Sequence, residues 1–183
     1  DEPTRHAGSV LGADGDAPFS ANRGATQLDI ALAHRPALVV NALGPPPQFM
    51  IDQVKAAGRR VGALAGAAQH AERHVNAGVD VIVAQGSEAG GHTGEVATMV
   101  LVPEIIRALD GAAPVLAAGG LGDGTQVAAV IGMGAQGAWM GSRWLTAAEY
   151  AEDGGSQAMQ KALLAATSRD TVRSRIYSGK PAR

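Results

Sequence analysis

The chain has no cysteine among its 183 residues, and aromatic residues make up only 3% of it. Without cysteine it can form neither a disulfide nor a thiolate zinc site, which fits a reducing compartment. Hydrophobic residues nevertheless make up 46% of the chain, so packing must rely on aliphatic and small side chains. Such a composition favours a layered α/β core over an aromatic-rich β-sandwich.

Strong charge and long apolar runs are also absent. The formal net charge is −2 and lysine and arginine form no run, which argues against nucleic acid or an anionic membrane as a partner. No apolar run reaches the roughly 20 residues that a membrane span needs, and residues 1–6 lack the basic and apolar parts of a signal peptide. We therefore expect one cytoplasmic domain that acts on small molecules.

The amino-terminal part lacks any sustained helical or strand period. It is rich in Gly, Asp, Ala, Pro and Ser, so residues 1–27 are predicted to be an irregular arm and residues 28–183 the folded domain. Thr26 and Asp29 together resemble a capping box, which predicts a short helix over the apolar residues that follow.

Strand and helix patterns then alternate along the chain. Apolar runs predict strands at residues 38–43, 60–64, 79–85, 114–118 and 137–140. Helical patterns follow them at residues 49–57, 67–77, the second half of 95–110, 124–133 and 158–166, and Pro103 is expected in the first turn of its helix. Strands that are each followed by a helix predict a parallel sheet with helices outside it.

A doubly wound sheet and a (β/α) barrel share this rhythm, but their loops differ. The last two predicted strands end in glycine-rich loops at residues 119–124 and 141–142, where barrel enzymes keep phosphate sites. A dinucleotide fold would have its glycines after the first strand, which here leads to three prolines. The sequence therefore predicts an α/β fold of the (β/α)8 barrel type, incomplete because five strands cannot close a barrel.

The strand at residues 79–85 leads into a loop with glycines at positions 86, 90, 91 and 94. Glycine permits positive φ and close approach of the backbone to another group. His92 lies in this loop and can move a proton or hold an anion, although an incidental polar residue is the alternative. Glu88 could act as a second acid, but it is expected to shape the loop as a hydrogen-bond partner. The other histidines, His6, His34, His70 and His74, are expected at the surface, and no spacing resembles a metal site.

Gly119 and Gly120 follow a predicted strand directly, and Asp123 and Gly124 open the next helix. Bare N–H groups beside a helix amino terminus favour a phosphate. Gly141 and Ser142 form a second such loop that would face the same point. A tight turn that needs glycine only for its shape is the alternative explanation.

Three motifs in this chain resemble the nitronate monooxygenase family, formerly called 2-nitropropane dioxygenases. They are AQGSEAGGHTG at residues 84–94, PVLAAGGLGDG at residues 114–124 and MGSRWL at residues 140–145. The family consists of FMN-dependent TIM barrels, and the likeness runs from about Leu38 to Arg183. The family has further β-α units before Leu38, so the resemblance indicates either a fragment or a half-barrel that pairs with another chain, and a homo-oligomer remains open.

The resemblance implies a flavin site and a reaction. Its implied cofactor contacts are Gln85, Gly90, Gly91, Gly119, Gly120, Trp139, Met140, Gly141 and Ser142, the last standing where the family usually has threonine. His92 matches the histidine that acts in catalysis or substrate binding. The implied reaction is the FMN-dependent oxidation of an alkyl nitronate with O2 to a carbonyl compound and nitrite, with no metal.

Two other functions remain open at this point. Flavin-dependent enoyl-acyl carrier protein reductases share the Glu-Ala-Gly-Gly-His loop and feed the flavin from a reduced nicotinamide. A non-catalytic half-barrel that serves as a binding or scaffold subunit is an alternative of another class.

Overall fold

A computed structural model describes residues 21–42, 44–176 and 178–183, with side chains from residue 24 onward. The strands are β1 (Leu38–Asn41), β2 (Arg60–Ala65), β3 (Val81–Gln85), β4 (Val115–Ala118) and β5 (Gly137–Trp139). The helices are α1 (Ala21–Ala33), α2 (Gln48–Ala56), α3 (Ala68–Asn76), α4 (Thr98–Leu109), α5 (Gly124–Gly132), the 3-10 helix η1 (Ser142–Thr146), α6 (Ala148–Glu152) and α7 (Gln157–Ala165).

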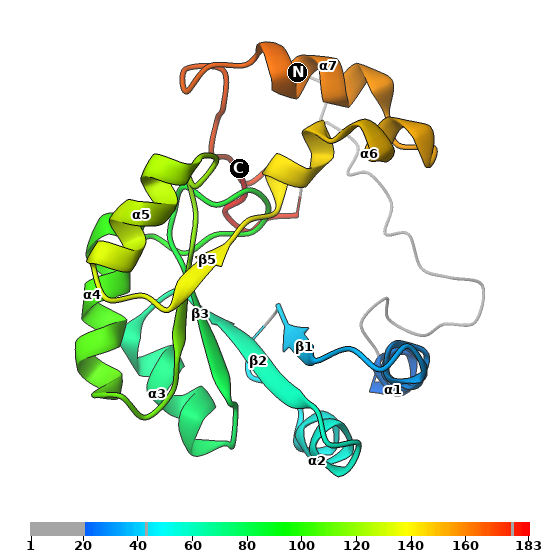
Figure 1. Ribbon diagram of the computed structural model, residues 1–183, viewed down its shortest axis with the longest axis vertical. Coiled ribbons are helices and arrows are strands. Elements are labelled where there is room, and N and C mark those ends of the chain that lie inside the picture. Colours follow the sequence, from blue (N-terminus) through cyan, green and yellow to red (C-terminus); the bar gives the residue numbers. More distant parts are fainter. Residues whose placement is uncertain (1–20, 43, 177) are drawn as a thin grey trace, which may run out of the picture.

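The five strands form one sheet in the order β1-β2-β3-β4-β5, and every neighbouring pair is parallel. This confirms the predicted parallel sheet. The order follows the sequence without reversal, as in a barrel, whereas a doubly wound sheet reverses its order at a switch point. Helices α2 to α5 surround one side of the curved sheet, and α6 and α7 lie beyond one end of it, at the top of Figure 1.

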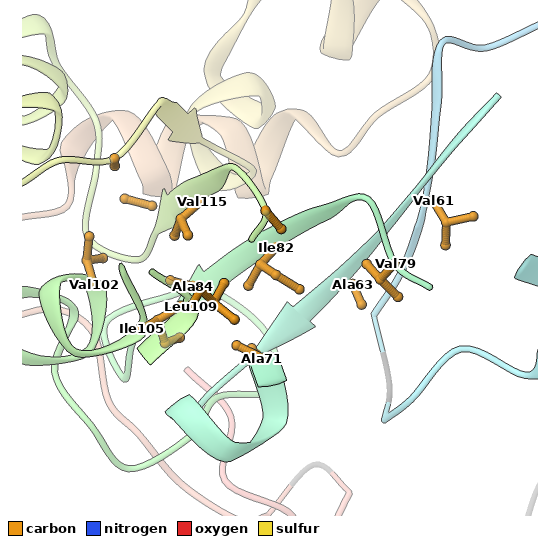
Figure 2. Packing of buried hydrophobic residues seen from close by; sticks show 14 of the residues in the cluster. Val61, Ala63, Ala71, Val79, Ile82, Ala84, Val102, Ile105, Leu109 and Val115 are labelled. Carbon is orange, nitrogen blue, oxygen red and sulfur yellow. The ribbon is translucent and has the colours of Figure 1, made fainter. Parts of the chain in front are cut away.

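The core lies between the sheet and these helices. In the central strands, Ile82 and Ala84 of β3 and Val115 and Ala117 of β4 are almost fully buried. Figure 2 shows Ile82, Ala84 and Val115 near Val102, Ile105 and Leu109 of α4. In α4, Leu101, Val102 and Ile105 are completely buried. Full burial of one such aliphatic side chain contributes about 1.5–3 kcal/mol, and the alanines let helix and sheet approach closely.

The opposite face of the sheet is less covered. Register pairs Gln85 with Ala118 and Ala118 with Trp139, so these three side chains form one row on that face. Leu64 and Leu116 on the same face are only half-buried, and Trp139 is 39% exposed. A closed barrel would bury this inner face, so its partial exposure agrees with the prediction of an incomplete barrel.

Two local predictions about helix starts were wrong. Helix α1 already begins at Ala21, so Thr26 lies inside it and residues 21–27 are helical rather than irregular. Leu28 on this helix is 5% exposed, and its packing against the core favours the longer helix. The rest of the predicted arm, residues 1–20, lies outside the described residues.

Pro103 lies within α4 rather than in its first turn, because the helix already begins at Thr98. A proline at this position removes one hydrogen bond from the helix to an earlier carbonyl. The turn ahead of Pro103 is held by buried Leu101 and Val102 and by an acceptor for the Thr98 N–H, the Glu88 carboxylate. Tertiary contacts therefore let the helix begin earlier in the chain than its sequence suggested.

His74 was expected at the surface but is 3% exposed. It lies on the same face of α3 as buried Ala71, three residues earlier, and its Nε2 lies 3.2 Å from the carbonyl oxygen of Leu64. Its Nδ1 is buried and has no partner among the described residues. Burial lowers the pKa of His74, so the imidazole is held neutral. His34 and His70 are exposed as predicted, and His6 lies outside the described residues.

The segment after β5 is more helical than the sequence suggested. Helix α7 matches the prediction closely, but η1 and α6 were not predicted. Helices in the described ranges are at most 13 residues long, and none of them is long and apolar enough to cross a bilayer.

Candidate flavin site at the carboxyl edge of the sheet

The predicted site residues lie at or just after the carboxyl ends of three adjacent strands. Gln85 ends β3, Gly119 and Gly120 follow β4, and Trp139 ends β5. The remaining predicted residues lie in the loops that follow β3 and β5, namely Gly90, Gly91, His92, Met140, Gly141 and Ser142. Because all three strands are parallel, these loops share the edge where barrel enzymes keep their active sites.

The loops after β3 and β5 meet at Gly90 and Ser142. A Cβ atom on Gly90 would lie 2.5 Å from the Ser142 Oγ, closer than non-bonded atoms can approach. Glycine at position 90 therefore lets the two loops close over β4, and it brings the Ser142 hydroxyl into the region expected to bind the cofactor.

Gly86 serves internal packing rather than close approach of a ligand. A Cβ atom on Gly86 would collide with Thr98 at the start of α4, and one on Gly119 would lie 2.6 Å from the Thr98 Oγ1. The Thr98 hydroxyl lies 3.0 Å from both the Gly119 carbonyl oxygen and the Glu88 Oε2. These two glycines therefore let α4 dock its first turn against the loops after β3 and β4.

The ionised carboxylate of Glu88 also joins α4 to the loop after β3. Its Oε2 accepts a hydrogen bond of 2.9 Å from the Thr98 N–H, at the amino terminus of α4. Burial alone would raise the pKa of Glu88, but hydrogen bonds from backbone N–H groups and from the Thr98 and Ser87 hydroxyls outweigh it, and the pKa is lowered. A negative charge at a helix amino terminus is favourable, so Glu88 has the loop-shaping role expected from the sequence.

The backbone at Gly119 and Gly120 offers unpaired donors. Both residues have positive φ, +114° and +69°, and a Cβ on Gly120 would lie 3.1 Å from the Glu88 Cβ. In the described part of the chain, the N–H groups of Gly119, Gly120 and Gly141 donate to no protein acceptor. Backbone N–H groups in positive-φ turns of this kind can bind an anion.

The amino terminus of α5 offers an anion fewer free N–H groups than the sequence predicted. The N–H groups of Thr125 and Gln126 already donate to the Asp123 carboxylate, at 2.8 and 3.0 Å, in a capping box. These first-turn donors are therefore not free for a ligand, because the side chain of Asp123 satisfies them. An anion here would depend on the loop N–H groups of Gly119, Gly120 and Gly141.

The loop around His92 is paired with the carboxyl-terminal segment. Gly91 and Arg183 exchange two backbone hydrogen bonds of 2.9 and 3.0 Å, and the Thr93 N–H donates to the Pro181 carbonyl at 3.0 Å. His92 is half-buried, and its Nε2 lies 2.6 Å from the Ser178 Oγ. Figure 1 shows the chain end beside the loop after β3. Sequence analysis missed this partner, because nothing local to residues 168–183 links them to His92.

Arg173 holds the other end of the same loop. Its guanidinium donates to the Thr93 Oγ1 at 3.0 Å, the Gly94 carbonyl at 2.9 Å and the Glu95 carboxylate at 2.9 Å. The hydrogen bond and charge of Arg173 lower the pKa of Glu95, so this ion pair persists at neutral pH. The loop that carries His92 is thus fixed on both sides.

Among the described residues, no three His, Cys, Asp or Glu side chains are grouped as metal ligands would be. A hollow of about 320 Å³, lined by residues that include Ile106, Pro114 and Gln136, lies at the amino ends of β4 and β5. This is the edge opposite to the glycine loops.

The chain belongs to the nitronate monooxygenase family, whose members are flavin-dependent oxidoreductases. The family's sequence profile matches residues 15–183. The chain is 57% identical over 156 residues to "Putative monooxygenase Rv1533" of Mycobacterium tuberculosis, covering 85% of this chain and 40% of that protein.

Two solved structures share the fold. FabK from Thermotoga maritima superimposes with a TM-score of 0.76 at 30% identity, covering 91% of this chain and 51% of FabK. Nitroalkane oxidase from Streptomyces ansochromogenes gives a TM-score of 0.76 at 28% identity, covering 87% of this chain and 48% of the oxidase. The chain thus spans about half the length of the relatives it matches.

Proposed function

We propose that this chain carries the phosphate-binding and histidine-bearing part of an FMN-dependent nitronate monooxygenase. The observation that carries the proposal is the convergence of three strand-end loops, which bring unpaired N–H groups and His92 to one edge of the sheet. When bound, FMN would supply the electron acceptor for oxidation of an alkyl nitronate, with O2 as the co-substrate, to give a carbonyl compound and nitrite.

The residues present fit a flavin phosphate. The unpaired N–H groups of Gly119, Gly120 and Gly141 and the Ser142 hydroxyl are donors, and glycine at position 120 leaves space beside Glu88. Gln85 and Trp139 share a row on the inner face, and the Gln85 amide has no partner among the described side chains. The proposed cofactor contacts are Gln85, Gly90, Gly91, Gly119, Gly120, Trp139, Met140, Gly141 and Ser142.

His92 is proposed to bind and orient the nitronate. A nitronate is an anion, and an imidazole N–H is a suitable donor to its oxygens. The loop that carries His92 is held on both sides by the carboxyl-terminal segment, so the imidazole is positioned before substrate arrives. Positioning of this kind reduces the entropy lost on reaching the reactive geometry.

The test is His92→Asn in the flavin-loaded protein. A hydrogen bond to a charged group contributes about 1.5–3 kcal/mol, and we expect kcat/KM for a nitronate to fall at least about tenfold, or about 1.4 kcal/mol, with flavin retained. Oxygen uptake measures the rate. His70→Asn, on an exposed site of α3, is the matched control. An unchanged kcat/KM in flavin-loaded His92→Asn would contradict the proposed role.

A flavin-dependent enoyl-acyl carrier protein reductase is the second candidate. The structural similarity to FabK supports it. The two reactions separate in one experiment, in which oxygen uptake with a nitronate is compared with NADH consumption in the presence of a crotonyl thioester. A protein that binds no flavin and catalyses neither reaction would instead favour a binding or scaffold subunit.

A further inference from the structure

We propose that Ser178 is a positioning residue that sets the tautomer of His92. Its hydroxyl donates to the Nε2 of His92, and the single imidazole hydrogen is thereby placed on Nδ1, the nitrogen that would donate to substrate. The choice of Nδ1 as the protonated nitrogen rests on the proposed nitronate reaction, because the hydrogen-bond geometry alone allows either tautomer.

The geometry brings one hydroxyl to one ring nitrogen. The Ser178 Oγ lies 2.6 Å from the His92 Nε2, a short hydrogen bond. The structure gives His92 Nδ1 no partner within the described part of the chain. Nε2 therefore hydrogen-bonds within the protein, and Nδ1 is available to a ligand.

Backbone hydrogen bonds hold the chain on either side of Ser178 as a hairpin. Ser174 and Ala182 exchange two backbone hydrogen bonds of 2.9 Å, and Ala182 also pairs with His92 in an antiparallel bridge. Residues 181–183 thus lie between residue 174 and the His92 loop. The paired residues on either side of Ser178 place this segment beside the His92 loop, where the serine hydroxyl reaches the imidazole.

A neutral imidazole allows two arrangements of this hydrogen bond. It has one N–H donor and one bare nitrogen acceptor. If Nε2 carried the hydrogen, it would donate to Ser178, and Nδ1 would turn a lone pair toward the anionic substrate. If Ser178 donates to Nε2 instead, Nδ1 carries the hydrogen and attracts the anion. A hydroxyl can serve either role, and only the second arrangement suits a nitronate.

The direct test is NMR of protein labelled with ¹⁵N in its histidines, at about pH 8.5, above the ordinary titration range of histidine. Couplings between the ring carbon hydrogens and the two nitrogens show which nitrogen is protonated. The His92 signals are those lost in His92→Asn. We expect Nδ1–H in the unaltered protein, a shift toward Nε2–H in Ser178→Ala, and Nδ1–H again in Ser178→Thr, which keeps the hydroxyl.

Ser174→Ala is the matched control. Ser174 belongs to the same hairpin, but its Oγ accepts from the Ile176 N–H rather than contacting the imidazole. The Ser174→Ala substitution should leave the His92 tautomer unchanged. In flavin-loaded protein, Ser178→Ala should lower kcat/KM about fivefold, the effect of one neutral hydrogen bond, and should add nothing in a His92→Asn background.

The tautomer assignment is overturned if His92 carries its hydrogen on Nε2 in the unaltered protein, or if Ser178→Ala leaves the tautomer as it was. Failure of the proposed reaction looks different. In that case His92→Asn would keep full nitronate turnover, whatever the NMR spectra show.

Discussion

His74 makes the folded protein sensitive to acid. Burial lowers its pKa from the ordinary 6.5, so the folded state keeps it neutral while the unfolded state binds a proton. The unfolded state therefore holds more protons between the lowered pKa and about 6.5, and the free energy of unfolding rises with pH across that window. The contribution is fully present above about pH 6.5 and is lost as the pH falls.

We predict that His74→Gln flattens this dependence, because glutamine can donate to the Leu64 carbonyl but does not titrate. Urea denaturation at several pH values between about 5 and 8 measures the free energy of unfolding. His70→Gln, on the exposed face of the same helix, should leave the slope in place. A slope unchanged in His74→Gln would show that other groups control the acid sensitivity.

Gly120 is the residue on which the proposed phosphate site depends most. Valine there would place a branched side chain against Glu88 and force it to adopt φ +69°, a strain of order 1–3 kcal/mol. We predict that Gly120→Val folds, as judged by circular dichroism, but loses FMN. Absorbance of the retained flavin measures this loss.

Gly58→Val is the matched control for backbone strain. Gly58 also has φ +69°, but it lies at the end of α2 and a Cβ there would meet nothing within 4 Å. Gly58→Val should show the cost of the backbone strain alone, and only Gly120→Val should lose the cofactor. Stoichiometric FMN in Gly120→Val would remove the phosphate assignment.

At the scale of elements, the carboxyl-terminal segment holds the His92 loop through backbone pairing and through Arg173. A guanidinium has donors in a planar fork that reach Thr93, Gly94 and Glu95 together, which a lysine ammonium cannot reproduce. We predict that Arg173→Lys speeds amide hydrogen exchange at Gly91 and Thr93, whose N–H groups pair with the carboxyl-terminal segment. Arg169→Lys, at an exposed position on the same segment, is the control. Equal exchange in both variants would show that Arg173 is not needed to hold the loop.

The sequence predicted those elements whose signal is local. Apolar runs such as residues 79–85 marked the strands, and glycines after them marked the loops at the carboxyl edge of the sheet. Helix starts were missed at α1 and α4, because packing of Leu28 and the Glu88 carboxylate overrode the local capping signals. The partner of His92 was missed because Ser178 is 86 residues away. Gly179 signals only a turn, and no local pattern shows which segment a turn will meet.

At the scale of the whole molecule, the sheet is a barrel segment that includes the edge with the three proposed site loops. Its described part ends at β1 on one side and β5 on the other, and the inner face around Leu64 and Leu116 is half-buried. The relatives are about twice as long as the matched region. All the proposed phosphate contacts, however, lie within residues 119–142, so phosphate recognition can be tested on this chain.

The most direct measurement compares binding of FMN and riboflavin to the purified protein, followed by quenching of flavin fluorescence. The two ligands share the ring system and differ in the phosphate that the Gly119, Gly120 and Gly141 N–H groups would bind. Charge-assisted hydrogen bonds contribute about 1.5–3 kcal/mol each, so FMN should bind at least about tenfold more tightly than riboflavin. Equal affinity for the two flavins, or no binding of either, would contradict a flavin phosphate site at this edge of the sheet.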